Sequence, residues 1–143
     1  MTSVAHLLHA KGHAVWAIAP DASVYEAIKL MADKEVGALL VMEGQRLVGI
    51  VSERDYARKV ILQGKSSRDT PVREIMTGNV VCVRPNQTVE DCMVLMTTHR
   101  IRHLPVLNDN QVRGVVSIGD LVKAVISEQE VRIQQLEQYI TGR

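Results

Sequence analysis

Phenylalanine is absent from this chain of 143 residues, and only 3% of its residues are aromatic. Any core must therefore be aliphatic, and the 46% of hydrophobic residues can supply it. So few aromatic side chains argue against the stacking platforms that bind single-stranded nucleic acid. The formal net charge of +1 also argues against a global positive field for nucleic acid or an anionic membrane.

Cysteine and long apolar runs are scarce as well. Cys82 and Cys92 form no CxxC pair, so we expect two buried small side chains in a reducing compartment. No apolar run approaches the roughly 18 residues of a membrane span, and residues 1–10 lack a signal-peptide pattern. We therefore expect a cytoplasmic protein without a membrane partner.

Motifs of catalytic chemistry are missing too. The sequence contains no nucleophile elbow, no GxxxxGK[ST] or GxGxxG loop, and no HExxH. His6 and His9 could share a helix face, but no third ligand of suitable type is near, so we expect no metal site. These absences favour a binding or regulatory protein, with no catalytic residue.

What the chain does contain is an internal repeat, in which residues 17–56 match 82–121 at an offset of 65 without a gap. The strongest match joins Gly49–Asp55 to Gly114–Asp120. Two copies related by pseudo-twofold symmetry would form one cleft twice. Polar residues shared by both copies are therefore candidates to line it.

Hydrophobic patterning predicts the order β-α-β-β-α in each copy. The first copy is expected to hold strands over 14–19, 37–42 and 47–51, a helix capped by Ser23, and a helix over 55–63. The second is expected to hold strands over 80–83, 104–107 and 112–116, a helix from its cap Thr88 to His99, and a helix from Asp120 towards Tyr139. A unit of about 60 residues has a thin core, so the copies should fold together as one α/β (α+β) body.

The end of the last helix, Ser127–Gln138, is charged and Gln-rich with a narrow apolar seam. It could be a solvated helix lying against its own domain, or it could be a dimer contact. Both interpretations stay open.

A Ser-x-x-Asp motif closes the last strand of each copy: Ser52 with Asp55, and Ser117 with Asp120. A hydroxyl at a helix start suits an anion, and the carboxylate could accept hydrogen bonds from two adjacent ribose hydroxyls. The same spacing is also a plain capping motif, so the pattern alone leaves both roles open.

Basic residues stand beside these motifs: Arg54, Arg58 and Lys59 in the first copy, and Arg100, Arg102 and His103 in the second. If the copies face each other, these side chains could converge on a polyanion near the pseudo-twofold axis; otherwise they form a solvated face. The first copy has Gly37 and Ala38 where the second has Arg102 and His103, so the two clefts should differ in polarity.

The tandem unit resembles a pair of CBS domains, also called a Bateman module. The resemblance rests on Gly49–Asp55, Ile101–Val106 and Gly114–Asp120, with Val72–Thr77 between the repeats. It predicts CBS repeats over 12–64 and 72–127 and a C-terminal helical extension over 128–143. The chain is also similar to stand-alone CBS-pair proteins of bacteria and plant organelles, which have no catalytic domain.

The resemblance implies a non-catalytic sensor of an adenosyl ligand (AMP, ADP, ATP or NAD) that forms a disc-like homodimer and signals to a protein effector by conformational change. By the family pattern, one cleft would use Ser52, Arg54, Asp55, Thr77, Val81, Ile101, Arg102 and His103. The other would use Ser117, Asp120, Trp16, Val36, Gly37 and Ala38. The two Asp side chains would hold ribose hydroxyls, and the Ser, Arg and His side chains would meet phosphates.

The two copies also differ, since Leu40 stands where the second has Pro105. We therefore expect two related clefts of unequal affinity, with the tighter one at Asp55. The alternative is a structural interaction or dimerisation module that binds no ligand.

Overall fold

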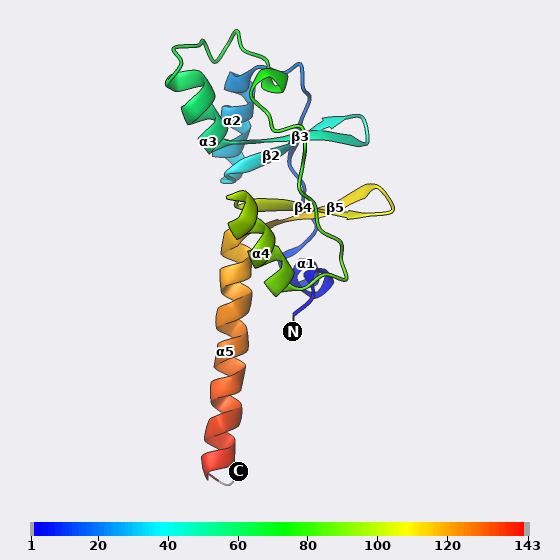
Figure 1. The fold of residues 1–143 in the computed structure, drawn as a ribbon, viewed down its shortest axis with the longest axis vertical. Helices are drawn as coiled ribbons and strands as arrows, with labels where there is room; N and C mark the ends of the chain where they lie inside the picture. Colours follow the sequence, from blue (N-terminus) through cyan, green and yellow to red (C-terminus); the bar gives the residue numbers. More distant parts are fainter. Residues whose placement is uncertain (1, 142–143) are drawn as a thin grey trace.

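The computed structural model describes residues 2–141 as two stacked units and a long C-terminal helix (Figure 1). The first unit holds β1 (Ala17–Ile18), α2 (Val24–Lys34), β2 (Ala38–Glu43), β3 (Arg46–Ser52) and α3 (Glu53–Tyr56), which continues as a π-helix over Ala57–Ile61. The second holds α4 (Val89–His99), β4 (His103–Asn108), β5 (Gln111–Ser117) and α5 (Ile118–Thr141). A short helix, α1 (Val4–Lys11), precedes both, and a 3-10 turn, Val72–Glu74, lies between them. The mixed α/β class and the tandem repeat are confirmed.

Strand pairing repeats at the same offset as the sequence. In the first unit β2 pairs antiparallel with β3, placing Val41 opposite Gly49, and in the second β4 pairs with β5, placing Val106 opposite Gly114. Both hairpins slip register one residue after the Val, so even the irregularity is copied.

The prediction of a strand over 80–83 is wrong. In this stretch only Val83 pairs with the sheet, through an isolated parallel β-bridge to Val106. In the first unit β1 runs parallel to β2, and Leu40 N–H donates to the Trp16 carbonyl at 3.1 Å. Pro105 stands at the position of Leu40 in the second unit. Since proline has no N–H to donate, the pairing cannot extend towards Val81.

The helix expected over 55–63 is also corrected. The Ser52 hydroxyl oxygen accepts a hydrogen bond from Asp55 N–H at 3.2 Å. Ser52 is therefore the N-cap, and α3 begins at Glu53. Ser117 accepts from the N–H of Asp120 at 3.2 Å in the same way. Each Asp therefore lies in the first turn of its helix, with its side chain directed back to the strand end.

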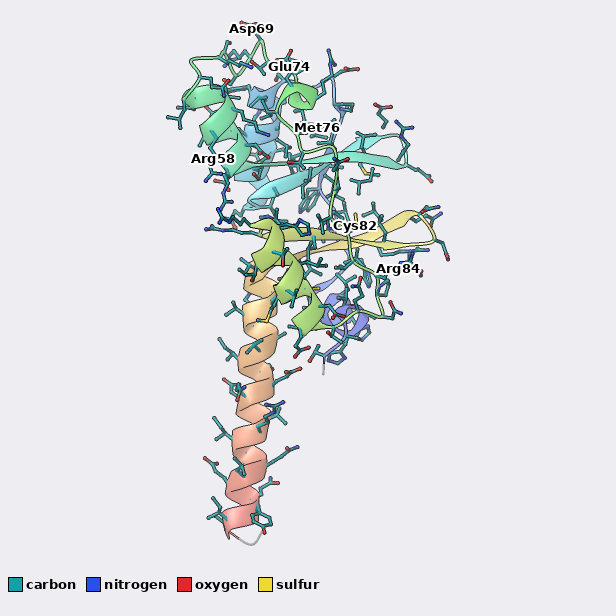
Figure 2. The ribbon with its side chains drawn as sticks, viewed as in Figure 1. Arg58, Asp69, Glu74, Met76, Cys82 and Arg84 are labelled. Atoms are coloured by element: carbon teal, nitrogen blue, oxygen red, sulfur yellow. The ribbon has the colours of Figure 1, made fainter. Side chains whose placement is uncertain are left out.

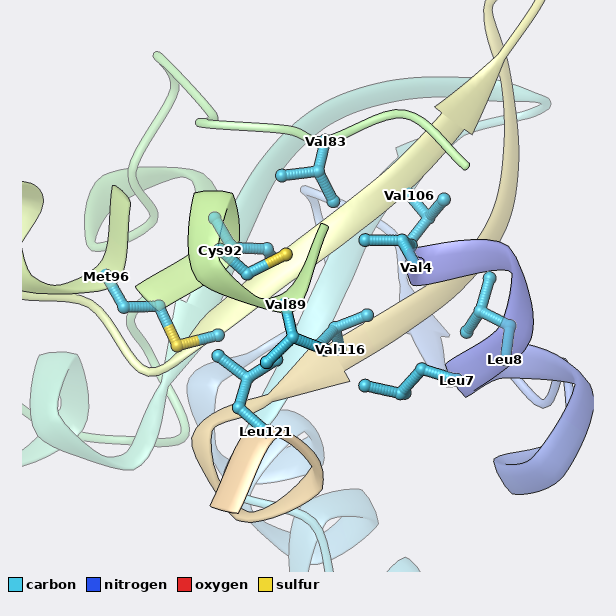
Figure 3. Close-up of a cluster of buried hydrophobic side chains, with 11 residues drawn as sticks. Val4, Leu7, Leu8, Val83, Val89, Cys92, Met96, Val106, Val116 and Leu121 are labelled. Atoms are coloured by element: carbon cyan, nitrogen blue, oxygen red, sulfur yellow. The ribbon is translucent and has the colours of Figure 1, made fainter. Parts of the chain in front are cut away.

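Each of the two units has its own aliphatic core. The first cluster includes Val24, Leu39 and Val51, and the second includes Val89, Leu104 and Val116. Each core also receives residues from outside its own stretch of the repeat. Val72 and Ile75 enter the first core, and α1 brings Val4, Leu7 and Leu8 into the second (Figure 3).

The N-terminal segment is thus the counterpart of the segment between the repeats, at an offset of 68. Val4 N–H donates to the Gln87 carbonyl at 2.8 Å, as Val72 N–H donates to the Ala22 carbonyl at 2.8 Å. The close approach requires glycine, because a Cβ on Gly114 would lie 2.8 Å from Leu8 Cδ2. Gly49, in the same place on the first unit, has Met76 against it instead.

The connecting segment runs from the first unit to the second and carries Met76 and Cys82 (Figure 2). Cys92 is buried, and burial, with the nearby charge of Asp91, raises the pKa of its thiol to about 11. Cys82 is only half-buried, against expectation, because its segment lies at the edge of the second sheet. Within residues 2–141, no helix combines the length and apolar character needed to cross a membrane.

Candidate functional site

Two cavities open between the units, and residues from both units line each of them. The larger, cleft one, has a volume of about 620 Å³, and the smaller, cleft two, about 330 Å³. Both volumes fall in the range of small-molecule sites, roughly 300–1,000 Å³.

Cleft one is lined by all eight residues that the resemblance to CBS domains assigns to it: Ser52, Arg54, Asp55, Thr77, Val81, Ile101, Arg102 and His103. Cleft two gathers its six: Ser117, Asp120, Trp16, Val36, Gly37 and Ala38. The grouping differs from expectation in one respect. Gly37, Ala38, Ile50 and His103 border both cavities, because the starts of β2 and β4, together with β3, form the wall between them.

Asp55 combines the two roles that its motif allows. One carboxylate oxygen, Oδ2, accepts from Ser52 N–H at 2.9 Å, which together with the bond from Asp55 N–H to Ser52 Oγ makes a capping box, and Oδ2 also accepts from the Ser52 hydroxyl at 3.1 Å. The other, Oδ1, lies 3.4 Å from Lys59 Nζ, one helical turn on. The cap therefore holds Asp55 in place and leaves Oδ1 with only a loose ion pair at the cavity edge.

Cleft one is strongly basic. Five Arg and Lys side chains line it, against two carboxylates: Arg54, Arg58, Lys59, Arg100 and Arg102, with Glu53 and Asp55. Arg54 Nη1 also donates to the Arg100 carbonyl at 3.0 Å, linking the two units across the cavity rim. A chain whose net charge is +1 thus concentrates positive potential in one hollow, where it favours an anion.

Cleft two has the opposite balance. Its only Lys or Arg among the lining residues is Lys11, against the carboxylates of Glu35 and Asp120. The two clefts therefore differ in polarity. This agrees with the difference between the repeats, which have Gly37 and Ala38 in the first copy and Arg102 and His103 at the matching positions of the second.

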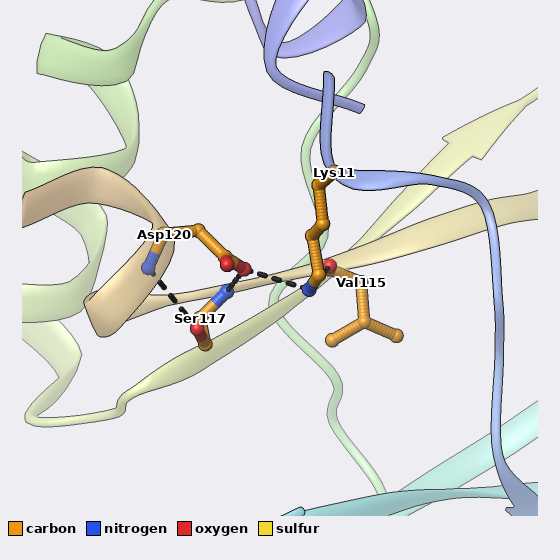
Figure 4. Close-up of polar contacts among 4 residues, drawn as sticks. All are labelled: Lys11, Val115, Ser117 and Asp120. Atoms are coloured by element: carbon orange, nitrogen blue, oxygen red, sulfur yellow. Dashed lines mark hydrogen bonds and ion pairs between the residues drawn. The ribbon is translucent and has the colours of Figure 1, made fainter. Parts of the chain in front are cut away.

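Lys11 occupies the carboxylate end of cleft two (Figure 4). Its Nζ lies 2.6 Å from Asp120 Oδ2 and donates to the Val115 carbonyl at 2.6 Å. Burial alone would raise the pKa of Asp120, but hydrogen bonds from Lys11 and Ser117 outweigh it, and the pKa lies below its ordinary value. Asp120 is thus already paired with a cation from within the chain.

Sequence reasoning missed Lys11 because nothing local marks it. It lies 109 residues from Asp120 and outside the 65-residue repeat. The helix α1 occupies the place where the first unit has a 3-10 turn of three residues, and Lys11 lies in its last turn. The counterpart in the first unit, Lys59, comes from the helix of Asp55 itself.

His103 lies in the wall between the clefts. Burial lowers the pKa of this imidazole below its ordinary value of 6.5, and the charge of Lys11 lowers it further. The charge of Asp120 opposes this effect, and that of Arg102 adds to it. The folded protein therefore resists protonation of His103.

We expect this resistance to appear in the pH dependence of stability. As the pH falls through about 6.5, the unfolded chain takes up a proton at His103 that the folded protein resists, so the free energy of unfolding should fall. In His103→Gln this contribution is removed, and the decline between about pH 7 and pH 5 should be shallower. Urea unfolding of both proteins across this range measures it; parallel curves would contradict the prediction.

No group of three or more His, Cys, Asp and Glu side chains able to hold a metal ion occurs within the described part of the chain. The histidines His6 and His9 both lie on α1.

Two repeated α/β units with paired clefts between them define a tandem two-repeat module, and the family comparison identifies its class. The CBS domain family model matches residues 13–61 and 72–127, so the chain belongs to the CBS-domain family. It is similar to the mitochondrial CBS domain-containing protein CBSX3 of Arabidopsis thaliana, with 43% identity over 99% of this chain and 73% of that protein. Proteins built only of CBS domains are generally regulatory.

Solved structures show the same architecture. A putative signal-transduction protein with CBS domains from Burkholderia ambifaria is 53% identical, with a TM-score of 0.87 over 90% of this chain and 96% of that one. The CBS domain pair of protein MJ0100 is 26% identical, with a TM-score of 0.79 over 90% of this chain and 98% of that one. That pair was solved in complex with 5′-methylthioadenosine and S-adenosyl-L-methionine.

Proposed function

We propose that this protein is a non-catalytic sensor that binds a phosphorylated adenosyl ligand (AMP, ADP, ATP or NAD) in cleft one. The observation that carries the proposal is the meeting of Asp55, held by its cap, with five cationic side chains in a cavity of about 620 Å³. The carboxylate Oδ1 can accept from a ribose diol, and the guanidinium groups can pair with phosphates. The adenosyl ligands of the MJ0100 pair support the adenosine part of the assignment.

The charge of cleft one favours phosphates over other adenosyl groups. S-adenosyl-L-methionine carries a sulfonium cation, which five Arg and Lys side chains would repel. 5′-Methylthioadenosine carries no phosphate and could use only the adenosine contacts. We therefore assign cleft one to nucleotides rather than to the ligands of the MJ0100 pair.

Cleft two is proposed as the weaker site. A ribose diol there must compete with Lys11 Nζ, which holds Asp120 Oδ2 at 2.6 Å. Because Gly37, Ala38 and His103 border both cavities, a ligand in one cleft can change the shape of the other. We propose that such a shift between the units is the signal to a protein effector; cytoplasmic location and the disc-like homodimer also stay predictions.

The proposal is tested by the order of affinities. We expect ATP to bind more tightly than AMP, by about tenfold for each added phosphate that finds a charged partner, and 5′-methylthioadenosine to bind weakest. Isothermal titration gives the dissociation constants, and melting provides a second measurement, since a ligand at a hundred times its Kd stabilises by roughly 2.7 kcal/mol. If none of these ligands binds at millimolar concentration, the alternative of an interaction module without a ligand is favoured.

A further inference from the structure

The second half of α5 stands free of the body of the protein (Figure 1). The helix has 24 residues, and every residue over 129–141 is exposed. This free part is about 20 Å long, and an isolated helix of that length is only marginally stable in water. The anchored first part of α5 nucleates this segment, and packing of an apolar face against a partner would stabilise it further.

The apolar residues of α5 lie on two distinct faces. Leu121, Ala124 and Val125 turn towards the second core. A second row has alternating spacings of four and three residues and continues along the free part: Val122, Ile126, Gln129, Ile133, Leu136 and Ile140. The five apolar members of this row are between 47% and 79% exposed. We call this row the α5 seam.

The α5 seam has the heptad pattern of a coiled coil. Ile126, Ile133 and Ile140 occupy the a positions, and Val122, Gln129 and Leu136 occupy the d positions. The combination that favours two parallel strands, a β-branched residue at a with Leu at d, occurs where Leu136 lies between Ile133 and Ile140. Gln129 places one polar layer at a d position of the seam, and burying it there would lower the stability of the coil.

We propose that a second copy of this chain covers the α5 seam and forms a parallel two-stranded coiled coil. Flanking charges support the parallel orientation. Arg132 lies at a g position and Glu137 at the next e position, the pair that meets between helices in a parallel coil. An antiparallel pairing would bring e positions together, placing Glu130 towards Glu137, two like charges.

The geometry has a consequence for the whole molecule. A parallel coil places both CBS pairs at its N-terminal end, so the two bodies would lie side by side. The seam spans less than three heptads, which makes the association reversible and dependent on concentration. This inference does not rest on nucleotide binding, and its test can fail or succeed independently of it.

Sedimentation velocity of the full chain over a wide range of concentration tests the dimer. We expect Ile133→Asp to weaken dimerisation by roughly 100-fold or more, because each dimer would bury two carboxylates. Val131→Asp is the matched control. Val131 is 50% exposed, against 54% for Ile133, but it lies at an f position outside the seam. The dimer of the Val131→Asp variant should therefore keep a dissociation constant within about threefold of that of the parent protein.

Oxidative cross-linking tests the orientation. In a parallel coil, two copies of Ile140→Cys meet in one layer and should form a disulfide beyond the background of the parent protein. Gln138→Cys, at an outward f position, should not. A chain that is monomeric throughout, or a dimer that survives Ile133→Asp, would overturn the seam as the interface; a seam-dependent dimer without the 140–140 cross-link would overturn the parallel arrangement.

Discussion

Asp55→Ala is expected to weaken ATP binding by about 100-fold or more, while lowering the free energy of unfolding by only about 1 kcal/mol. The large effect follows from the loss of a carboxylate positioned to accept from two ribose hydroxyls, since each hydrogen bond to a charged group contributes roughly 1.5–3 kcal/mol. The small effect follows from the loss of a helix cap. Isothermal titration and urea unfolding measure the two quantities separately.

Asp91→Ala is the matched control for this experiment. Thr88 and Asp91 form the same capping box at the start of α4, with distances of 3.0 and 3.1 Å against 2.9 and 3.2 Å at Asp55. Asp91 is not among the residues that line either cleft. The Asp91→Ala variant should therefore lose about as much free energy of unfolding as Asp55→Ala, but bind ATP with the affinity of the parent protein. If Asp55→Ala bound ATP as the parent does, Asp55 would be only a cap.

Leu8→Ala is expected to lower the free energy of unfolding by about 3 kcal/mol, because it empties a buried leucine site. Leu8 is 1% exposed and lies against Gly114 in the core of the second unit. Leu62→Ala is the control, since Leu62 is 77% exposed and its loss should change stability by less than about 0.5 kcal/mol.

Removal of residues 2–8 should have a still larger effect. It strips Val4, Leu7 and Leu8 from the second core, each a loss of about 1–5 kcal/mol, against a typical total stability of about 5–15 kcal/mol. We expect the truncated chain to lose cooperative unfolding of its second unit, as followed by circular dichroism in urea. An unchanged unfolding midpoint would show that the N-terminal segment is dispensable.

Much of the fold could be predicted because the repeat at an offset of 65 carries its own turn and cap signals. Thr88 caps α4, which ends at His99 as expected. The errors have local causes. The strand at 80–83 fails because Pro105 cannot donate the hydrogen bond that Leu40 donates, and this effect acts across strands rather than along the sequence.

The candidate site was predictable where the two copies have identical residues at matching positions. Ser52 and Ser117, with Asp55 and Asp120, lie as expected at strand ends beside the two cavities. Lys11 was not predictable, because the N-terminal segment matches its counterpart at an offset of 68 with few shared letters, mainly Thr2 with Thr70 and Val4 with Val72. A search for a second, shorter repeat could have aligned the N-terminal segment with its counterpart, but only the structure brings Lys11 to Asp120.

The amino-acid sequence by itself determined the tandem architecture, the aliphatic cores and the two Ser-x-x-Asp motifs, because periodicity and capping are local properties that a repeat displays twice; the remaining cleft residues were expected from the resemblance to CBS domains. Only the tertiary structure decided which charged side chains meet in each cleft. Cleft one collects five cations from both units, whereas cleft two receives Lys11 from a helix that packs on the second core. Electrostatic potential depends on distances through space, and these are set only when the two units and the N-terminal segment pack together.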